Sequence, residues 1–216
     1  MTAEKKPTKR ELIDLERVKN MQLFDRRSYS GDLKEVCGMD EVGRGPLAGP
    51  VVVAAVSFFD LEPIAIINDS KKMTETRRNK ANEIIRQRAK YSLASVDNNT
   101  IDEINILNAT RKAFVDAYKN LDTKIKFVMH DSIDIKLGLP KISVVAGDNK
   151  SYCIAAASII AKVYRDNLMV EYDKIYPQYS FAKNKGYGTK EHIEAINKYG
   201  ITPIHRKSFL TRILEK

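Results

Sequence analysis

Cysteines and long apolar runs are scarce in this sequence. It holds two cysteines, Cys37 and Cys153, in unrelated contexts and outside any CxxC or Cys/His pattern. This usage predicts free thiols in a reducing, cytoplasmic setting and argues against a zinc site. The longest apolar run, 51–59, is broken by Ser57 and is much shorter than the ~18 residues of a membrane span. No apolar stretch follows the positive charges at the N-terminus, so we expect neither a secretory signal nor membrane association.

Internal repeats and low-complexity linkers are also absent. A chain of 216 residues, of which 43% are hydrophobic, fits one domain with a real core. Residues 1–30 are polar and charged, and their apolar residues follow a modest helical spacing at Leu12, Leu15, Val18 and Met21. We therefore expect a short helical extension outside the core over 1–30, followed by one domain over 31–216.

Strand and helix patterns alternate along that domain. The β-rich runs are 36–39, 51–59, 91–96, 125–129 and 142–145. The helical patterns run from about Thr74 to Lys90, from a capping box at Thr100–Glu103 to Leu121, from 154 to 175, and from 189 to 199, before Gly200. The alternation predicts an α/β fold with a mixed central sheet, an antiparallel pair around the first glycine turn, and helices at the C-terminus. Small residues at 155–158 predict close packing of a helix on the sheet.

Positive charge exceeds negative charge. There are 37 Lys and Arg against 28 Asp and Glu, for a net charge of +9 and a pI near 9.4. From 183 to 216 the chain has eight basic and three acidic residues, interleaved with Tyr187, Tyr199 and Phe209. Clustered basic charge with aromatic residues favours a nucleic-acid partner. A solvated basic surface is the alternative.

Carboxylates follow three of the expected strands. Asp40 and Glu41 come after VCGM, Asp131 comes after FVMH, and Asp148 comes after VVAG. Strand ends are where α/β sheets assemble their sites. For Asp131 and Asp148, a turn or a helix N-cap is the alternative role. Neither a tight turn nor a cap requires two adjacent carboxylates beside an arginine and three glycines.

If these four carboxylates converge, their mutual repulsion calls for bound cations. Carboxylate oxygens are hard ligands, which indicates Mg²⁺ or Mn²⁺. Two such ions clamp an in-line displacement at phosphorus, where one activates water and the other stabilises the leaving oxygen. Bound metal would therefore turn an acidic cluster into a phosphate site.

The glycine turn at 43–49 has two open interpretations. Its G-x-G-x-x-x-G spacing differs from the dinucleotide fingerprint, and a β-rich run rather than a helix follows it. The chain has no Walker sequence either, so we exclude a nucleotide cofactor. The turn is either a plain hairpin connection or a rigid loop that lies against a polymer. In the second case the glycines permit close approach to sugar and phosphate, and Arg44 can reach either.

Four long blocks of the sequence carry a family resemblance. They are GMDEVGRGPLAGPVVVAAV at 38–56, NDSKKMT at 68–74, AGDNKSYCIAAASIIAKVYRD at 146–166 and NKGYGTKEHIEAINKYGITPIHRKSF at 184–209. In this order they resemble ribonuclease HII, and the resemblance extends over nearly all of 36–209.

The resemblance implies a fold, an activity and a set of catalytic residues. The expected fold is an RNase H-like catalytic domain over 31–216 with a C-terminal helical substrate-binding region. The expected enzyme is a metal-dependent endonuclease that cuts the RNA strand of RNA/DNA hybrids, and cuts 5′ of a single ribonucleotide in duplex DNA to leave a 3′-hydroxyl and a 5′-phosphate. The implied catalytic and metal-binding residues are Asp40, Glu41, Asp131 and Asp148, with Mg²⁺ or Mn²⁺ as cofactor.

The resemblance also implies substrate contacts, made by a monomer. Gly43, Arg44 and Gly45 match a loop that senses the ribose 2′-hydroxyl, the group that distinguishes RNA from DNA. Tyr187 matches a tyrosine that packs against the next sugar, a deoxyribose. Two further segments are expected to contact the nucleic-acid backbone, with a solvated basic surface as the alternative. Their residues are Ser70, Lys71, Lys72, His205, Arg206, Lys207 and Ser208.

A few residues depart from the family pattern or stand outside it. The departures are His130, Asn149 and Cys153, and strand alternation should point His130 away from the face of Asp131. We expect Asp166 to pair with a neighbouring cation and His192 to lie on the surface. Two other functions stay open: another RNase H-like metal nuclease, such as a DNA-junction nuclease, and a nucleic-acid-binding protein without catalysis.

Overall fold

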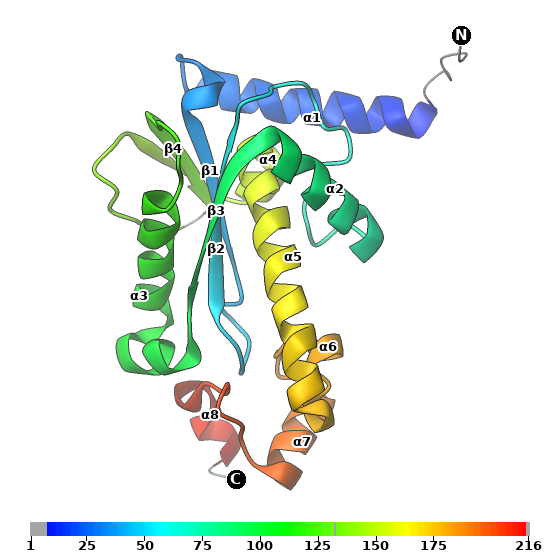
Figure 1. Cartoon of the computed structure of the whole chain (residues 1–216), viewed down its shortest axis with the longest axis vertical. Helices are drawn as coiled ribbons and strands as arrows, with labels where there is room; N and C mark the ends of the chain where they lie inside the picture. Colours follow the sequence, from blue (N-terminus) through cyan, green and yellow to red (C-terminus); the bar gives the residue numbers. More distant parts are fainter. Residues whose placement is uncertain (1–7, 132, 215–216) are drawn as a thin grey trace.

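A five-stranded mixed sheet forms the centre of the computed structural model, which describes residues 8–131 and 133–214 (Figure 1). The strand order is β3-β2-β1-β4-β5. β1 is antiparallel to β2 and parallel to β4, β2 is antiparallel to β3, and β4 is parallel to β5. The strands are β1 (Val36–Val42), β2 (Val51–Phe58), β3 (Ala89–Val96), β4 (Phe127–Asp131) and β5 (Lys141–Val144). The predicted α/β fold with a mixed sheet and an antiparallel first pair is therefore confirmed.

Helices cover both faces of the sheet. The α-helices are α1 (Lys9–Ser28), α2 (Glu75–Arg88), α3 (Asn98–Lys119), α4 (Gly147–Lys150), α5 (Tyr152–Ile175), α6 (Phe181–Asn184), α7 (Lys190–Tyr199) and α8 (Lys207–Leu214), with short 3₁₀ turns at η1 (Leu33–Glu35) and η2 (Pro177–Tyr179). α5 packs on one face together with α1 and α2, and α3 packs on the other (Figure 1). No helix in the described part of the chain has the length and apolar character needed to cross a membrane.

The contact between α5 and β1 is unusually close. A side-chain carbon at Gly38 would lie 2.1 Å from the carbonyl carbon of Cys153, so only glycine permits this approach. Ala155, Ala156 and Ala157 are all fully buried on the same helix. The predicted close packing of small residues against the sheet is confirmed. It brings the middle of α5 next to the residues that follow Gly38 on β1.

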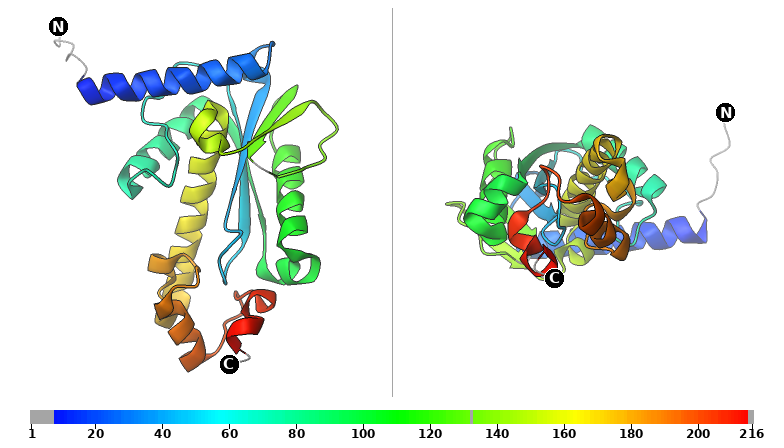
Figure 2. Two further views of the ribbon diagram at one scale, coloured as in Figure 1. Left: turned by 180° about the vertical axis from the view of Figure 1, so that it is seen from behind. Right: turned by 90° about the horizontal axis from the view of Figure 1, so that it is seen from below.

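Helix α1 differs from the expectation that it lies outside the core. Val18 and Met21 are buried in the same apolar cluster as α5, while Leu12 and Ile13 near its start are exposed. The buried Asp25 accepts a hydrogen bond from the backbone N–H of Cys153 (3.1 Å) at the start of α5. From Asp14 onward α1 is thus part of the domain, since Asp14 pairs with Arg77 on α2 (2.9 Å), and residues 9–13 form its exposed outer end (Figure 2).

Helix α3 begins earlier than the capping box at Thr100 suggested. Asp97 is the N-cap, and its side chain accepts a hydrogen bond from the backbone N–H of Thr100 (2.8 Å). The other sequence-based helix starts lie close to the observed ones, since Thr74 caps α2, Thr189 caps α7 and Gly200 ends α7.

The C-terminal helices form a separate small cluster below the sheet (Figures 1 and 2). This cluster packs against Ala48 in the connection between β1 and β2. Backbone hydrogen bonds tie the two regions together: Leu47 N–H donates to Gly186 (2.8 Å), and Gly49 N–H donates to Ile204 (2.9 Å). The connection between β1 and β2 is therefore held by segments that lie about 140 to 155 positions later in the chain.

Candidate active site

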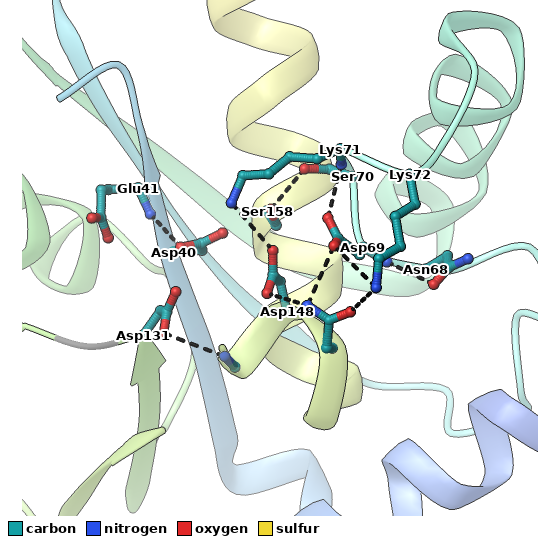
Figure 3. Close-up of polar contacts among 12 residues, drawn as sticks. Asp40, Glu41, Asn68, Asp69, Ser70, Lys71, Lys72, Asp131, Asp148 and Ser158 are labelled. Atoms are coloured by element: carbon teal, nitrogen blue, oxygen red, sulfur yellow. Dashed lines mark hydrogen bonds and ion pairs between the residues drawn. The ribbon is translucent and has the colours of Figure 1, made fainter. Parts of the chain in front are cut away.

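Four carboxylates from three elements surround one end of the sheet (Figure 3). Asp40 and Glu41 lie on β1 and Asp131 ends β4. The last paired residues of these parallel strands are Met39 and His130, so Asp40 and Asp131 occupy the next position on each. Asp148 lies on the short helix α4, which is tied to β4 by a hydrogen bond from Gly147 N–H to Asp131 Oδ1 (3.3 Å). The structure thus brings together all four carboxylates singled out in the sequence.

The electrostatics of this cluster reflect negative charge in a confined place. Asp40 is 5% exposed. Its pKa is raised well above the ordinary value, first by burial and then by the charge of Glu41, with Asp131 and Asp148 adding to the rise and a hydrogen bond from Ser158 opposing it. Burial also raises the pKa of Glu41, against the opposing effect of Arg44, whose Nη1 lies 3.3 Å from Glu41 Oε1. The carboxylates therefore carry more negative charge than the neighbouring cations offset.

The donor set fits divalent cations that prefer oxygen ligands. Glu41 Oε2 is buried and accepts no hydrogen bond within the described part of the protein. A buried carboxylate oxygen without a donor is an available metal ligand. Among residues 8–131 and 133–214, no three acidic, His or Cys side chains already gather closely enough to hold a metal ion. The chemistry of the site therefore suits Mg²⁺ or Mn²⁺, and the carboxylates must draw together to hold one.

The 68–72 turn brings two lysines, Lys71 and Lys72, close to the carboxylate cluster (Figure 3). Lys71 Nζ lies 3.6 Å from Asp148 Oδ2. The pKa of Asp148 is raised by burial and then by the charge of Asp69, an effect that Lys71 opposes. Lys72 Nζ donates to Asn149 Oδ1 (2.6 Å), and Asn149 Nδ2 donates to Asp148 Oδ1 (3.0 Å). Lys71 and Lys72 are both exposed, so their charges are available to a ligand above the carboxylates.

Asp69 is a part of the site that sequence reasoning missed. It is buried and accepts hydrogen bonds from Lys71 N–H (2.9 Å) and Asn149 Nδ2 (3.3 Å), and Lys72 Nζ lies 3.6 Å away. It thereby fixes the turn that carries both lysines. Ser70 Oγ shares a hydrogen bond with Ser158 Oγ (2.9 Å), which anchors the same turn on α5. In the sequence, Asp69 could have been noticed as an acidic residue directly before Ser70, Lys71 and Lys72.

A pocket of about 160 Å³ opens between the carboxylates and the C-terminal region. Its walls are formed by Asp40, Glu41, Val42, Ser70, Lys71, Ser158, Lys162 and Tyr187. Tyr187 is 43% exposed at its rim.

Asp166 stays outside the pocket, where it pairs with Lys162 (2.7 Å) and Arg78 (3.5 Å), so its predicted structural role is confirmed.

The glycine loop at 43–49 is a rigid connection. Gly43 has a φ of +91°, and a side-chain carbon there would lie 2.2 Å from Nε of the buried Arg165, so both the backbone and the space require glycine. Arg44 and Gly45 are exposed at the tip of the loop. A side-chain carbon at Gly45 would lie 3.6 Å from Tyr187 Cε1. The loop connects the antiparallel pair β1 and β2, and its tip stands beside Tyr187, so its contact with a polymer stays a prediction.

Comparison with known proteins places this arrangement in a family. Residues 37–212 match the sequence profile of Ribonuclease HII. The Ribonuclease HII of Caldanaerobacter subterraneus subsp. tengcongensis is 49% identical over 204 residues, which cover 94% of this chain and 85% of the relative. The Ribonuclease HII of Clostridium perfringens is 52% identical over 92% of this chain and 74% of the relative. This chain belongs to the ribonuclease HII family. It is therefore a type 2 ribonuclease H, an endonuclease of a family that cleaves RNA in RNA/DNA hybrids.

Solved structures agree with the family assignment. The crystal structure of ribonuclease H2 from Pyrococcus horikoshii superposes with a TM-score of 0.71 at 26% identity, covering 83% of this chain and 97% of the other. The RNase HII of Archaeoglobus fulgidus, solved as a complex with PCNA, gives a TM-score of 0.69 at 25% identity, with 80% and 94% coverage. The RNase H-like fold expected from the resemblance is confirmed.

Three residues predicted to contact the substrate backbone are buried in this protein, and one of them, Ser70, is 2% exposed and bonded to Ser158 as described above. His205 and Arg206 are 1% and 0% exposed, so neither presents its side chain to a ligand. The guanidinium of Arg206 donates to the carbonyls of Gly43 (2.6 Å), Arg44 (2.9 Å) and Gly49 (2.9 Å). Its role is to hold the glycine loop from beneath. The neighbouring Lys207 and Ser208, at the start of α8, are exposed. Their backbone N–H groups donate to the carboxylate of Asp102 on α3 (2.8 and 3.0 Å).

His192 was expected on the surface, and the structure buries it completely against His205. Thr202 N–H donates to His205 Nδ1 (2.9 Å), which leaves the proton of His205 on Nε2, 3.0 Å from His192 Nε2. His192 then carries its own proton on Nδ1 and donates to the carbonyl of Tyr187 (2.9 Å). Burial lowers the pKa of His205 to about 4, in agreement with a neutral ring. The pair fixes the backbone of Tyr187.

The departures from the family pattern do not displace a carboxylate. His130 is buried with its ring 6.2 Å from that of Phe114 on α3, on the face opposite Asp131, as strand alternation predicted. Cys153 is buried in the first turn of α5, and Asn149 links Asp148 to Lys72 as described above. Asn149 is thus the departure that touches the site directly.

Proposed function

We propose that this protein cuts 5′ of a single ribonucleotide embedded in duplex DNA, as well as RNA in RNA/DNA hybrids, and leaves a 3′-hydroxyl and a 5′-phosphate. The observation that carries the proposal is the position of the glycine loop. Its tip adjoins Tyr187, and the pocket beside Tyr187 is lined by Asp40 and Glu41. The loop tip and tyrosine that would recognise the sugar therefore lie beside the carboxylates that would cut the adjacent phosphodiester.

The four carboxylates Asp40, Glu41, Asp131 and Asp148 are proposed to hold two divalent cations, Mg²⁺ or Mn²⁺. When bound, such ions supply a nucleophilic water and stabilise the leaving oxygen of a phosphodiester. The chain's own contribution is to hold the carboxylates on β1, β4 and α4. The backbone N–H of Glu41 donates to Asp40 Oδ1 (2.9 Å) and keeps this carboxylate oriented in the metal-free protein. For the proposed ends, water attacks phosphorus, the P–O3′ bond breaks, and the phosphate stays on the ribonucleotide.

The basic groups around the pocket are proposed to orient the substrate strand. Lys71 and Lys72 project from the 68–72 turn (Figure 3). Arg44 is exposed at the tip of the glycine loop. Each is close to a carboxylate in the free protein and can exchange that partner for a phosphate. Lys207 extends this exposed basic surface at the start of α8.

Selection of the ribonucleotide is proposed to come from the glycine loop and Tyr187. The backbone of Gly43–Gly45 can approach a ribose closely enough to hydrogen-bond its 2′-hydroxyl. The Tyr187 ring packs best against a sugar that lacks this hydroxyl, because a ring face offers no partner to a buried polar group. The enzyme would then recognise a ribose followed by a deoxyribose.

The proposal is tested with three duplexes of equal length: one ribonucleotide in DNA, an RNA/DNA hybrid, and DNA alone. Each is incubated with Mg²⁺ or Mn²⁺, with Asp40→Asn as the inactive control. Cleavage 5′ of the ribonucleotide with a 5′-phosphate product supports the proposal. Equal cleavage of the all-DNA duplex would instead identify a nuclease indifferent to the sugar, such as a DNA-junction nuclease.

A monomer in the reducing cytoplasm is the proposed working form. The carboxylates, the glycine loop and Tyr187 all come from one chain, so no second copy is needed to complete the site. Light scattering of the purified protein should give the mass of one chain. A stable dimer mass would contradict this.

A further inference from the structure

Two arginines beneath the glycine loop are fully buried, and within the described residues all their side-chain hydrogen bonds go to backbone carbonyls. Arg165 on α5 donates to Pro50 (2.9 Å), Ala48 (3.1 Å) and Lys185 (2.9 Å), and it is 0% exposed. Arg206 donates to the three loop carbonyls named above, at Gly43, Arg44 and Gly49. Together the two guanidiniums fix five carbonyls of residues 43–50.

Neither guanidinium has a carboxylate partner. Within residues 8–131 and 133–214, no Asp or Glu oxygen lies within ion-pair distance of Arg165 or Arg206. Burial lowers the pKa of Arg206 to about 9, and the neighbouring charge of Arg165 contributes to the shift. Burying two cations side by side costs free energy. Their hydrogen bonds offset this cost by satisfying five loop carbonyls, which apolar residues would leave without donors.

The hydrogen bonds of Arg206 set the direction of two loop N–H groups. All peptide bonds in the described residues are trans, and in a trans peptide the C=O and the N–H point in opposite directions. The inward carbonyl of Gly43 therefore turns the N–H of Arg44 outward, and the inward carbonyl of Arg44 turns the N–H of Gly45 outward. Neither N–H donates to any acceptor in the described part of the chain, and both residues are exposed.

We propose that Arg206 and Arg165 are positioning residues for substrate recognition: Arg206 holds the carbonyls of Gly43 and Arg44 inward so that the N–H groups of Arg44 and Gly45 face the sugar-phosphate backbone at the ribonucleotide, and Arg165 fixes the far end of the loop through Ala48 and Pro50. The inference deepens the proposed function and rests on it. The arginines do not touch the nucleic acid. They act through the loop, and their unpaired positive charge lies directly behind the two donors, where it favours an approaching phosphodiester.

The fork geometry and the charge of Arg206 make separate contributions. Lysine keeps the charge but has no planar fork to hold three carbonyls at once. Methionine fills similar space and removes both. In an Asp40→Asn background, which prevents cleavage, we expect Arg206→Lys to change affinity for all-DNA duplex less than about twofold and to reduce the affinity advantage of a one-ribonucleotide duplex about fivefold or more. Arg206→Met should weaken both affinities.

The ratio of the two affinities is the deciding readout, because partial unfolding lowers both affinities equally and leaves the ratio unchanged. Arg17→Lys is the matched control: Arg17 also donates to two carbonyls, of Ala65 (3.0 Å) and Ile67 (2.9 Å), but lies on α1. We expect its ratio to equal that of the parent. An unchanged ratio in Arg206→Lys, or equal affinity of the parent for both duplexes, would overturn the inference.

A second measurement needs no arginine variant and decides the matter if Arg206→Lys does not fold. Amide proton exchange of Arg44 and Gly45 in the Asp40→Asn protein should be fast without ligand and slow at least about tenfold with the one-ribonucleotide duplex, but not with all-DNA duplex. Unprotected amides in both complexes would contradict the inference. Wild-type cleavage measured alongside separates the two claims: failure to cut at the ribonucleotide refutes the proposed function, whereas cutting with an unchanged ratio or unprotected amides refutes only this inference.

Discussion

Gly45 stands against the ring of Tyr187, and a side-chain carbon added at Gly45 would lie 3.6 Å from Cε1 of that ring. This is ordinary van der Waals contact, and the φ of Gly45 is not positive. The glycine is therefore not needed for folding. It leaves open the space where the loop tip and the ring would meet a sugar.

Gly45→Ala should accordingly reduce activity with little change in stability, whereas Gly43→Ala should reduce stability. Gly45→Ala is expected to leave the free energy of unfolding nearly unchanged and to reduce kcat/KM on a one-ribonucleotide duplex about tenfold, because the methyl group occupies the proposed sugar site. Gly43→Ala is expected to lower the free energy of unfolding by about 1–3 kcal/mol or more, since its φ is +91° and Arg165 lies 2.2 Å away. Chemical denaturation and steady-state cleavage check the pair. A strongly destabilised Gly45→Ala protein would contradict the geometry.

Tyr187→Ala should erode selection of the junction more than it affects folding. The ring is partly exposed at the rim of the pocket, so its loss leaves no large cavity in the core. We expect kcat/KM on the one-ribonucleotide duplex to fall about tenfold more than on the hybrid. Arg44→Ala should act in the same direction, through loss of a charge that can bind the substrate. Unchanged preference in both variants would count against their roles.

Asp40→Asn should abolish turnover while leaving affinity for the duplex similar or higher, because negative charge is removed from the pocket. It should also raise the thermal midpoint of the metal-free protein, since burial and Glu41 make ionised Asp40 unfavourable there. Asp148→Asn is expected to abolish turnover in the same way. The matched control is Asp166→Asn, which breaks the pair with Lys162 and should lower the midpoint but retain cleavage. Intact cleavage with a large loss of affinity in Asp40→Asn would refute its assignment as a metal ligand.

Asp25 should make stability depend on pH. Burial raises its pKa from 3.8 to about 6 in the folded protein. The folded state thus binds the proton more tightly than the unfolded state, so this contribution to stability is fully present below pH 3.8 and is lost as the pH rises through about 6. Between about pH 4.5 and about pH 7.5, the stability of wild type relative to Asp25→Asn should fall by about 2 kcal/mol. Denaturant unfolding of both proteins at the two pH values measures this. A constant difference would contradict it.

The sequence indicated the carboxylate cluster better than the contacts that support the loop beside it. Asp40, Glu41, Asp131 and Asp148 were recognisable because acids at strand ends form a pattern along the chain. The role of Arg206 was not, because its partners are backbone carbonyls more than 150 positions away, and such contacts leave no trace in side-chain types. Arg165 was missed for the same reason.

Long-range partners also explain the remaining differences. His192 sits in a polar stretch of sequence, and its burial depends on His205, a residue in a different segment. The burial of Val18 on α1 depends on contact with α5, which the weak helical spacing of 1–30 did not show. By contrast, β2 and the first part of each of β1 and α5 have apolar or small residues in succession, and their approximate positions could be predicted because local pattern and tertiary burial agree.

The central claim is that one pocket both detects a single ribose and cuts beside it. The most direct test is cleavage of a DNA duplex that contains one ribonucleotide, end-labelled on that strand, by wild-type protein with Mg²⁺ or Mn²⁺. We expect one cut, 5′ of the ribonucleotide, with a 5′-phosphate on the downstream product, and no cut in the all-DNA duplex or with Asp40→Asn. A cut at another position, or equal cutting of the all-DNA duplex, would contradict the claim.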